Sequence, residues 1–198
     1  MIHKPEVFII ESLNLDDERE KRHEGQFLSQ ILALGGKNPL YYYIRTKFEL
    51  RKLLKQFDES HYRYLHLSCH GSNSSIETTF TSILFSEFGR ILRPYLSEKR
   101  LFVSACSAVN QKLAREMFRT PGCISLIGPG KDVQFNDAAI IWASFYHLMF
   151  KINEERMAKD DIRPTLTELQ HLFEVPLNYY SRSNDVDGFR RVQLNSNV

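Results

Sequence analysis

The chain has 198 residues, of which 42% are hydrophobic and 25% charged, and its formal net charge is +2 at pH 7. These values exclude a disordered chain, a collagen-like repeat and a disulfide scaffold, and they predict one domain over residues 1–198. Residues 1–60 carry ten basic and ten acidic side chains, so the sequence shows no segment with the one-signed charge typical of polyanion-binding proteins. We therefore expect neither nucleic acid nor a membrane as a partner.

The N-terminus and the cysteines bear on the compartment. Residues 1–6 lack the apolar core of a signal peptide, and the sequence has no run of 18 apolar residues. Three cysteines, Cys69, Cys106 and Cys123, have spacings that match no zinc pattern. The sequence thus predicts a reducing, cytoplasmic location and no metal site.

The first half of the chain alternates between apolar runs and helical patterns. In chain order it contains a strand over 7–10, an acidic polar stretch over 14–24, a helix over 27–34, a strand over 40–44, a helix over 48–57, a strand over 62–68 and a small hairpin over 76–87. Gly35 and Gly36 would end the first helix. Thr46 has the residue type and position of an N-cap for the second.

The second half continues the alternation. It contains a helix over 91–96, a strand over 101–103, a helix over 111–118, a strand over 124–127, a helix over 138–150, a charged connector over 154–163, a helix over 165–173 and a terminal strand within 188–194. Alternation of this kind predicts an α/β fold with a mostly parallel central sheet and helices on both faces.

Two strand ends carry residues suited to chemistry. In an open α/β sheet, binding sites lie at the carboxyl ends of the strands. The third strand runs into His70 and Gly71, and the fourth runs into Cys106. If these strands are neighbours, Cys106 can act as a nucleophile with His70 as its base. The backbone N–H groups of Gly71 and Cys106 could then form an oxyanion hole.

These residues also carry a family resemblance. An apolar run into His70-Gly71, a second into Ser104-Ala105-Cys106, a strand at 124–128 and then Phe145-Tyr146 within a helix occur in this order. The pattern resembles the clan CD, or caspase-like, cysteine peptidases, and among them most closely the CHAT domains related to separase. The resemblance implies a three-layer α/β/α sandwich, and it implies a thiol protease that acts on a protein or peptide substrate. It further implies control by a regulatory or sensor protein and a role in bacterial defence signalling.

The sequence departs from the caspases proper at the residue two before the cysteine, where Ser104 replaces a glutamine. This departure argues against aspartate specificity. In related domains, an acidic residue after the fifth strand recognises a basic P1 side chain, and Asp132 and Asp137 both lie in that stretch. The resemblance thus points to cleavage after Arg or Lys, although Asp137 could instead cap the helix expected from residue 138. Related metacaspases use calcium, but no acidic cluster here demands it, so we expect no cofactor.

Other interpretations stay open from the sequence alone. His70 could be a structural histidine and Cys106 a packed small residue, in a caspase fold that serves as a catalytically idle interaction or regulatory module. The same thiol could also serve an esterase or acyltransferase. Cys69 should point to the face of the strand opposite to His70, because side chains alternate along a strand. We expect Cys69 and Cys123 to be core residues.

Overall fold

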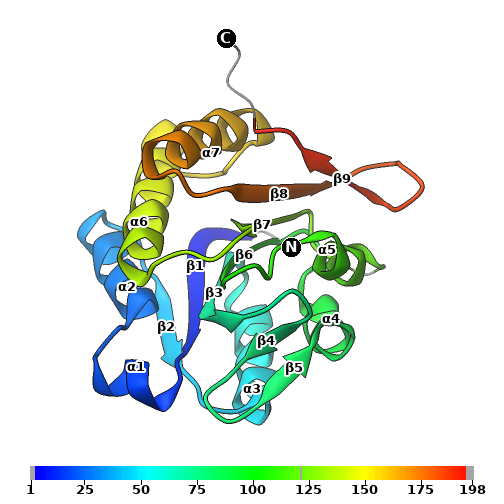
Figure 1. Ribbon diagram of the computed structural model, residues 1–198. Helices are drawn as coiled ribbons and strands as arrows, with labels where there is room; N and C mark the ends of the chain where they lie inside the picture. The colour runs from blue at the N-terminus through cyan, green and yellow to red at the C-terminus, as the bar shows by residue number, and fades with distance from the viewer. Residues whose placement is uncertain (1–2, 121, 195–198) are drawn as a thin grey trace.

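A computed structural model describes residues 3–120 and 122–194 and shows a nine-stranded sheet at the centre of the molecule (Figure 1). Its strands run in the order β2-β1-β3-β6-β7-β8-β9, and the hairpin β4–β5 extends from the end of β3. The first five strands of this order are parallel to one another, and β8 and β9 add antiparallel to one side. The strands are β1 Lys4–Ser12, β2 Leu40–Tyr43, β3 Tyr62–Gly71, β4 Ser75–Glu77, β5 Ser82–Leu84, β6 Arg100–Ser104, β7 Ser125–Pro129, β8 Leu177–Arg182 and β9 Phe189–Val192.

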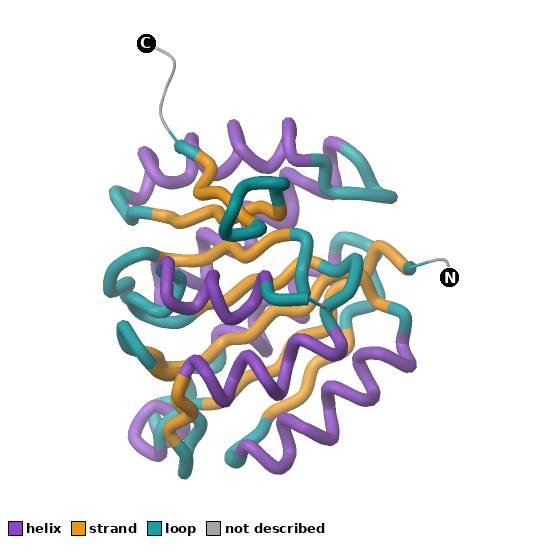
Figure 2. The backbone as a smooth tube through the Cα atoms, turned by 90° about the vertical axis from the view of Figure 1, so that its right-hand side faces the viewer, coloured by secondary structure: helices purple, strands orange, loops and turns teal. Residues whose placement is uncertain are grey.

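Helices cover both faces of this sheet, as Figures 1 and 2 show. One face packs against α3 Lys47–Ser60, α4 Phe85–Leu92 and α5 Gln111–Phe118, with the 3-10 turn η1 Arg93–Tyr95 continuing α4. The other face packs against α2 Glu24–Leu34, α6 Phe135–Ile152 and α7 Lys159–Phe173, and the short helix α1 Leu15–Arg19 follows β1. No helix within the described residues is long and apolar enough to cross a membrane. The expected mostly parallel α/β/α arrangement is confirmed.

Several boundaries differ from the sequence expectation. The helix expected from residue 138 begins at Phe135, and the expected connector 154–163 contains the start of α7 at Lys159. The charged side chains of this segment hid the helix, because only Ile162 of its first four residues is buried. β8 had no predicted counterpart, since its sequence LNYYSR mixes polar and aromatic residues although nearly all of it is buried. α1 was also missed, because five residues are too short for a periodic apolar pattern.

The start of α3 follows the sequence expectation closely. Thr46 is the N-cap, and its side chain accepts a hydrogen bond from the backbone N–H of Glu49. The Glu49 carboxylate accepts one in return from the backbone N–H of Thr46 at 2.9 Å, which completes a capping box. These reciprocal bonds fix where the helix begins and which face it turns toward the sheet.

Side-chain alternation along β3 assigns each residue to one face. His66 lies on the α2–α6 side, where its ring contacts Trp142 and Tyr146. Cys69 packs instead against the core on the α3–α4 side. The ring of His70 contacts Phe135 at the start of α6, so it lies on the α2–α6 side, opposite to Cys69. The expectation that Cys69 faces away from His70 is confirmed.

Phe102 on β6 is the centre of the core on the α2–α6 side. Its fully buried ring contacts four other aromatic rings, Tyr64, Trp142, Phe145 and Tyr146, at centroid distances of 5.3–6.2 Å. Phe102→Ala is expected to lower the free energy of unfolding by about 3–5 kcal/mol, because it removes buried area and leaves a cavity.

Urea titration followed by circular dichroism measures this loss. Phe80→Ala is the matched control, because the Phe80 side chain is 62% exposed and its loss should change stability by only about 0.5 kcal/mol or less. Equal losses in the two variants would contradict this description of the core.

Candidate active site

The carboxyl ends of β3 and β6 lie side by side. The two strands are parallel neighbours, and Ser68 on β3 pairs with Ser104 on β6. His70 and Cys106 each follow this pair by two residues. Beyond the paired region the chains stay close, because a Cβ added at Gly71 would lie 3.0 Å from the Cβ of Ala105. The strand adjacency that the sequence argument required is therefore present.

A tight turn presents Cys106. The next residue, Ser107, has a positive φ of 56°, in the left-handed region that few non-glycine residues adopt. Two hydrogen bonds hold this conformation: the Ser107 N–H donates to the carbonyl of Lys131 at 3.2 Å, and its hydroxyl donates to Asp132 at 2.9 Å. The Cys106 sulfur lies against the backbone of Val133, 3.5 Å from its nitrogen and 3.6 Å from its oxygen. The partly exposed thiol is thus held between β6 and the segment that leads into α6.

His70 is held by a carboxylate that the sequence argument missed. Its Nε2 lies 2.6 Å from the Oδ2 of Asp17 in α1, whose side chain is only 8% exposed. Asn14 caps α1 by accepting from the Asp17 N–H at 2.8 Å, and its amide nitrogen lies 3.1 Å from the same histidine Nε2. The edge of the His70 ring also contacts Phe135, at a centroid distance of 5.6 Å. Asp17 and Asn14 thus both lie at Nε2 of the imidazole.

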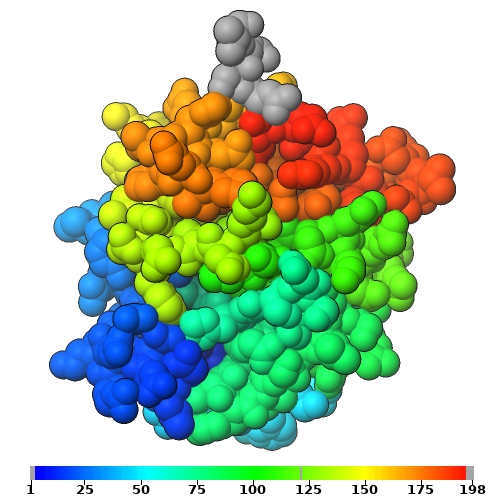
Figure 3. Space-filling model, in the orientation of Figure 1, coloured from blue at the N-terminus to red at the C-terminus, as the bar shows by residue number. Residues whose placement is uncertain are grey.

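Three segments that are distant in sequence therefore meet at this edge. They are α1, the end of β3 and the segment that leads from β7 into α6, and Figure 3 shows their blue, teal and yellow-green surfaces together on one face. His70 contacts the last segment at Phe135 and Cys106 contacts it at Val133. One short stretch of chain thus lies against both members of the expected dyad.

A buried polar network lies beneath the dyad. Ser104, two residues before Cys106, donates a hydrogen bond at 2.9 Å to Glu24 at the start of α2. The other carboxylate oxygen of Glu24 lies 3.7 Å from Nε2 of the fully buried His66. Nδ1 of His66 is in turn 3.1 Å from the hydroxyl of Tyr146 on α6. The network joins α2 and α6 to the strand ends and so fixes the base of the turn at Cys106.

Glu11 at the end of β1 anchors the same helix from the neighbouring strand. Its carboxylate accepts hydrogen bonds from the N–H of Gly25 and the hydroxyl of Tyr41, both at 2.7 Å. Burial raises the pKa of the Glu11 carboxyl above its ordinary value, and these two hydrogen bonds partly counteract the shift. The carboxylate thus holds α2 against the end of the strand that precedes α1.

The two remaining cysteines differ from Cys106 in environment. Burial raises the pKa of the Cys69 thiol well above its ordinary value, and it raises the pKa of Cys123 to about 12. Cys123 is fully buried and its sulfur faces the carbonyl of Met117 at 3.8 Å. Cys123 packs in the core on the α3–α4 side, which confirms the expectation for it, and Cys69 is partly buried against the same core.

The two acidic candidates occupy different positions relative to the thiol. Asp132 accepts the Ser107 hydroxyl and precedes Val133, so it lies directly beside the turn at Cys106. Asp137 lies within the first turn of α6, where it accepts a hydrogen bond at 3.2 Å from the side chain of its neighbour Asn136. The alternative capping role expected for Asp137 is wrong, because α6 begins earlier and Gln134 occupies the N-cap position.

A surface cavity of about 420 Å³ lies next to Phe135, and neither His70 nor Cys106 lines it. Phe135 contributes both to this cavity and to the contact with the imidazole, and Arg22 and His23 form part of the opposite wall. Neither Asp132 nor Asp137 lines it. Among the described residues, no three His, Cys, Asp or Glu side chains are grouped so that they could hold a metal ion.

Comparison with known proteins identifies the fold. No protein-family model matches the sequence, and comparison with curated proteins gives no match. Among solved structures, the chain is similar to a secreted C11 cysteine protease from Bacteroides thetaiotaomicron, "iotapain", with a TM-score of 0.56 and 8% sequence identity. The similarity covers 91% of this chain and 67% of that protease. The α/β/α sandwich described above is therefore the caspase-like fold.

Proposed function

We propose that this chain is a cysteine endopeptidase in which Cys106 is the nucleophile and His70 the general base and acid. The observation that carries the proposal is the position of both residues. His70 lies at the carboxyl end of β3 and Cys106 just after its parallel neighbour β6 in a caspase-like sheet, and a buried carboxylate from a third segment contacts the imidazole. A nucleophile, a base and a group that orients the base are the components that thiol catalysis requires.

The proposed reaction proceeds through a thioester. His70 accepts the thiol proton, and the Cys106 sulfur attacks the scissile carbonyl carbon to form a tetrahedral intermediate. The carbon–nitrogen bond then breaks as the imidazolium donates its proton to the leaving amine. A water molecule, deprotonated by His70, attacks the thioester carbonyl, which releases the new carboxyl group and restores the thiol. The N–H groups of Gly71 and Cys106 are the proposed donors to the oxyanion in both tetrahedral intermediates.

Asp132 is the first candidate for recognition of a basic P1 side chain. Its carboxylate is exposed and lies beside the turn that carries the nucleophile, whereas the hydrogen bond of Asp137 is to its neighbour Asn136 in α6. A guanidinium or ammonium group of the substrate would find a carboxylate close to the reacting sulfur at Asp132. The proposal thus favours cleavage after Arg or Lys, with Asp132 setting the preference.

A peptide library with all residue types at P1 tests the proposed function. We expect the wild-type protein to cleave after Arg or Lys, and Asp132→Ala to lower kcat/KM for Arg substrates about 10-fold to 100-fold, with little change for P1 Ala. Asp137→Ala is the matched control and should keep the preference. If Asp137→Ala alone abolishes it, the assignment to Asp132 is wrong. If the folded protein cleaves no peptide, the chain is a catalytically idle interaction module, and cleavage of esters only would indicate an acyltransferase or esterase.

A further inference from the structure

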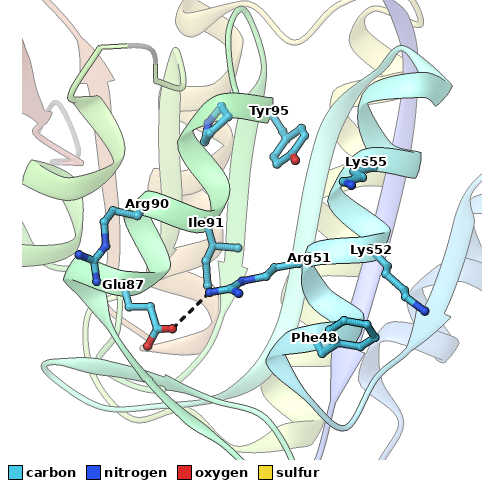
Figure 4. Close-up of a pocket in the computed structure, with 9 residues that line it drawn as sticks. Phe48, Arg51, Lys52, Lys55, Glu87, Arg90, Ile91 and Tyr95 are labelled. Atoms are coloured by element: carbon cyan, nitrogen blue, oxygen red, sulfur yellow. Dashed lines mark ion pairs between the residues drawn. The ribbon is translucent and has the colours of Figure 1, made fainter.

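A second concave site lies between α3 and α4, on the face of the sheet opposite to α2 and α6. This α3–α4 groove has a volume of about 700 Å³ and contains four cationic and two aromatic side chains: Arg51, Lys52, Lys55, Arg90, Phe48 and Tyr95. Figure 4 shows the α3 residues on one side and those of α4 and η1 on the other. Neither wall of the groove contains a residue of the expected active site.

The charges of the groove are unbalanced. Its single carboxylate, Glu87, is already engaged by Lys47 at 3.1 Å and by Arg51 at 3.5 Å. Lys52 lies over the ring of Phe48, 4.7 Å from its centroid. Lys55 and Arg90 form no ion pair with any residue that the structure describes, although the whole chain carries a net charge of only +2. The groove therefore has a local excess of positive charge, because it contains four cations and one carboxylate.

The shape of the groove favours an extended ligand. The α3 residues that line it, at positions 48, 51, 52 and 55, form one stripe along the helix, about 10 Å long at 1.5 Å per residue. Phe48 at one end of the stripe is 63% exposed. Among the lining residues no glycine offers the close backbone approach typical of phosphate-binding loops, and the cations are flexible side chains spread over two helices. A compact phosphate group would meet only part of this array.

We infer that the α3–α4 groove binds an acidic peptide segment of a partner protein. The segment combines Asp or Glu side chains, which face Lys52, Lys55 and Arg90, with an apolar residue that covers the ring of Phe48. Grooves between two helices accept amphipathic segments in this way. Complementary charge contributes to the rate of association and to the choice of partner, and the apolar contact adds affinity. This site is independent of the proposed peptidase function, because it shares no residue with the dyad.

Fluorescence anisotropy with a labelled peptide of about twelve residues, built from Glu-Glu-Leu-Phe repeats, tests the inference. We expect saturable binding that weakens as salt rises, since charges on the surface are screened over about 8 Å at physiological ionic strength. The double variant Lys52→Glu/Arg90→Glu should raise Kd about tenfold or more. Phe48→Ala should weaken binding even at high salt, where the apolar contact remains.

Matched controls separate the groove from general basicity. Lys112→Glu/Arg115→Glu reverses two exposed charges on the neighbouring helix α5, outside the groove, and should leave Kd unchanged. A peptide with Lys in place of Glu should not bind. The inference is overturned if both double variants lose affinity equally or if no saturable binding occurs. It is also overturned if ATP competes at lower concentration than the peptide, which would make the groove a phosphate site.

Discussion

Replacing Cys106 by alanine is expected to lower kcat/KM for peptide cleavage by at least about 10⁴-fold, because no other group in the site can form the thioester. The fold should remain intact, since the Cys106 side chain is only partly buried and contacts the backbone of Val133. His70→Ala is expected to cause a loss of similar size, and the double variant should lose little more than either single one. Such non-additivity is typical of residues that act as a unit.

Covalent labelling gives a readout that does not depend on finding a natural substrate. A peptide acyloxymethyl ketone with Arg at P1 should modify Cys106 of the wild-type protein, as located by mass spectrometry. Cys69 and Cys123 should stay unmodified in the native state, because burial raises the pKa of both thiols and keeps them protonated. The label should be absent from Cys106→Ala and strongly reduced in His70→Ala. Rapid labelling of His70→Ala would remove the histidine from the proposed mechanism.

Asp17→Asn is expected to lower kcat by about 10²-fold to 10⁴-fold with little change in KM. An aspartate that accepts from one ring nitrogen fixes the tautomer and orientation of a catalytic histidine and stabilises the imidazolium formed during the reaction. Asp17 has this geometry at His70, with 2.6 Å between its Oδ2 and Nε2. An asparagine of the same shape could turn its amide N–H₂ toward the ring and favour the wrong tautomer. We therefore propose Asp17 as a positioning residue, whose loss should affect the chemical step more than substrate binding.

The kcat values of Asp16 and Asp17 variants distinguish this role from a structural one. Asp16→Asn is the matched control, because Asp16 is an exposed neighbour whose ion pair is with Arg19 rather than with His70. This variant should retain wild-type kcat, and Asp17→Glu should recover part of the activity that Asp17→Asn loses. Asp17→Asn also weakens the ion pair of Asp17 with Arg22, whose atoms are 3.0 Å apart. Thermal unfolding therefore measures the folded fraction of each variant. If kcat falls only in proportion to the folded fraction, Asp17 has no role beyond stability.

Local patterns in the sequence were enough to predict most of the sheet. The apolar runs at 7–10 and 101–103 correspond to β1 and β6, because a parallel strand buried on both faces must be apolar almost throughout, and the aromatic and aliphatic residues of 62–68 correspond to β3. The same logic identified His70 and Cys106, since each is among the first polar or reactive residues after such a run. Alternation along the strand also predicted that Cys69 faces away from the dyad.

Contacts between distant segments could not be predicted in this way. Asp17 meets His70 because β1 pairs with β3, so that the chain leaving β1 folds back over the end of the neighbouring strand. The sequence did show an acidic stretch directly after the first strand, but it did not reveal which strand lay beside it. The charge of the α3–α4 groove was hidden for the same reason. Basic and acidic residues balance along the chain, yet the fold places Arg90 of α4 in one groove with the cations of α3.

The sequence by itself thus predicted the fold class and most of the parallel strands, and it singled out His70 and Cys106 as candidates. These features follow from burial and periodicity within short segments, which act wherever the segment lies in the fold. Only the tertiary structure showed the strand order, the carboxylate that contacts His70, the place of Asp132 beside the turn at Cys106 and the cationic groove. Each of these depends on which segments become neighbours when the core forms, and that choice is made by packing of the whole chain rather than by any local pattern.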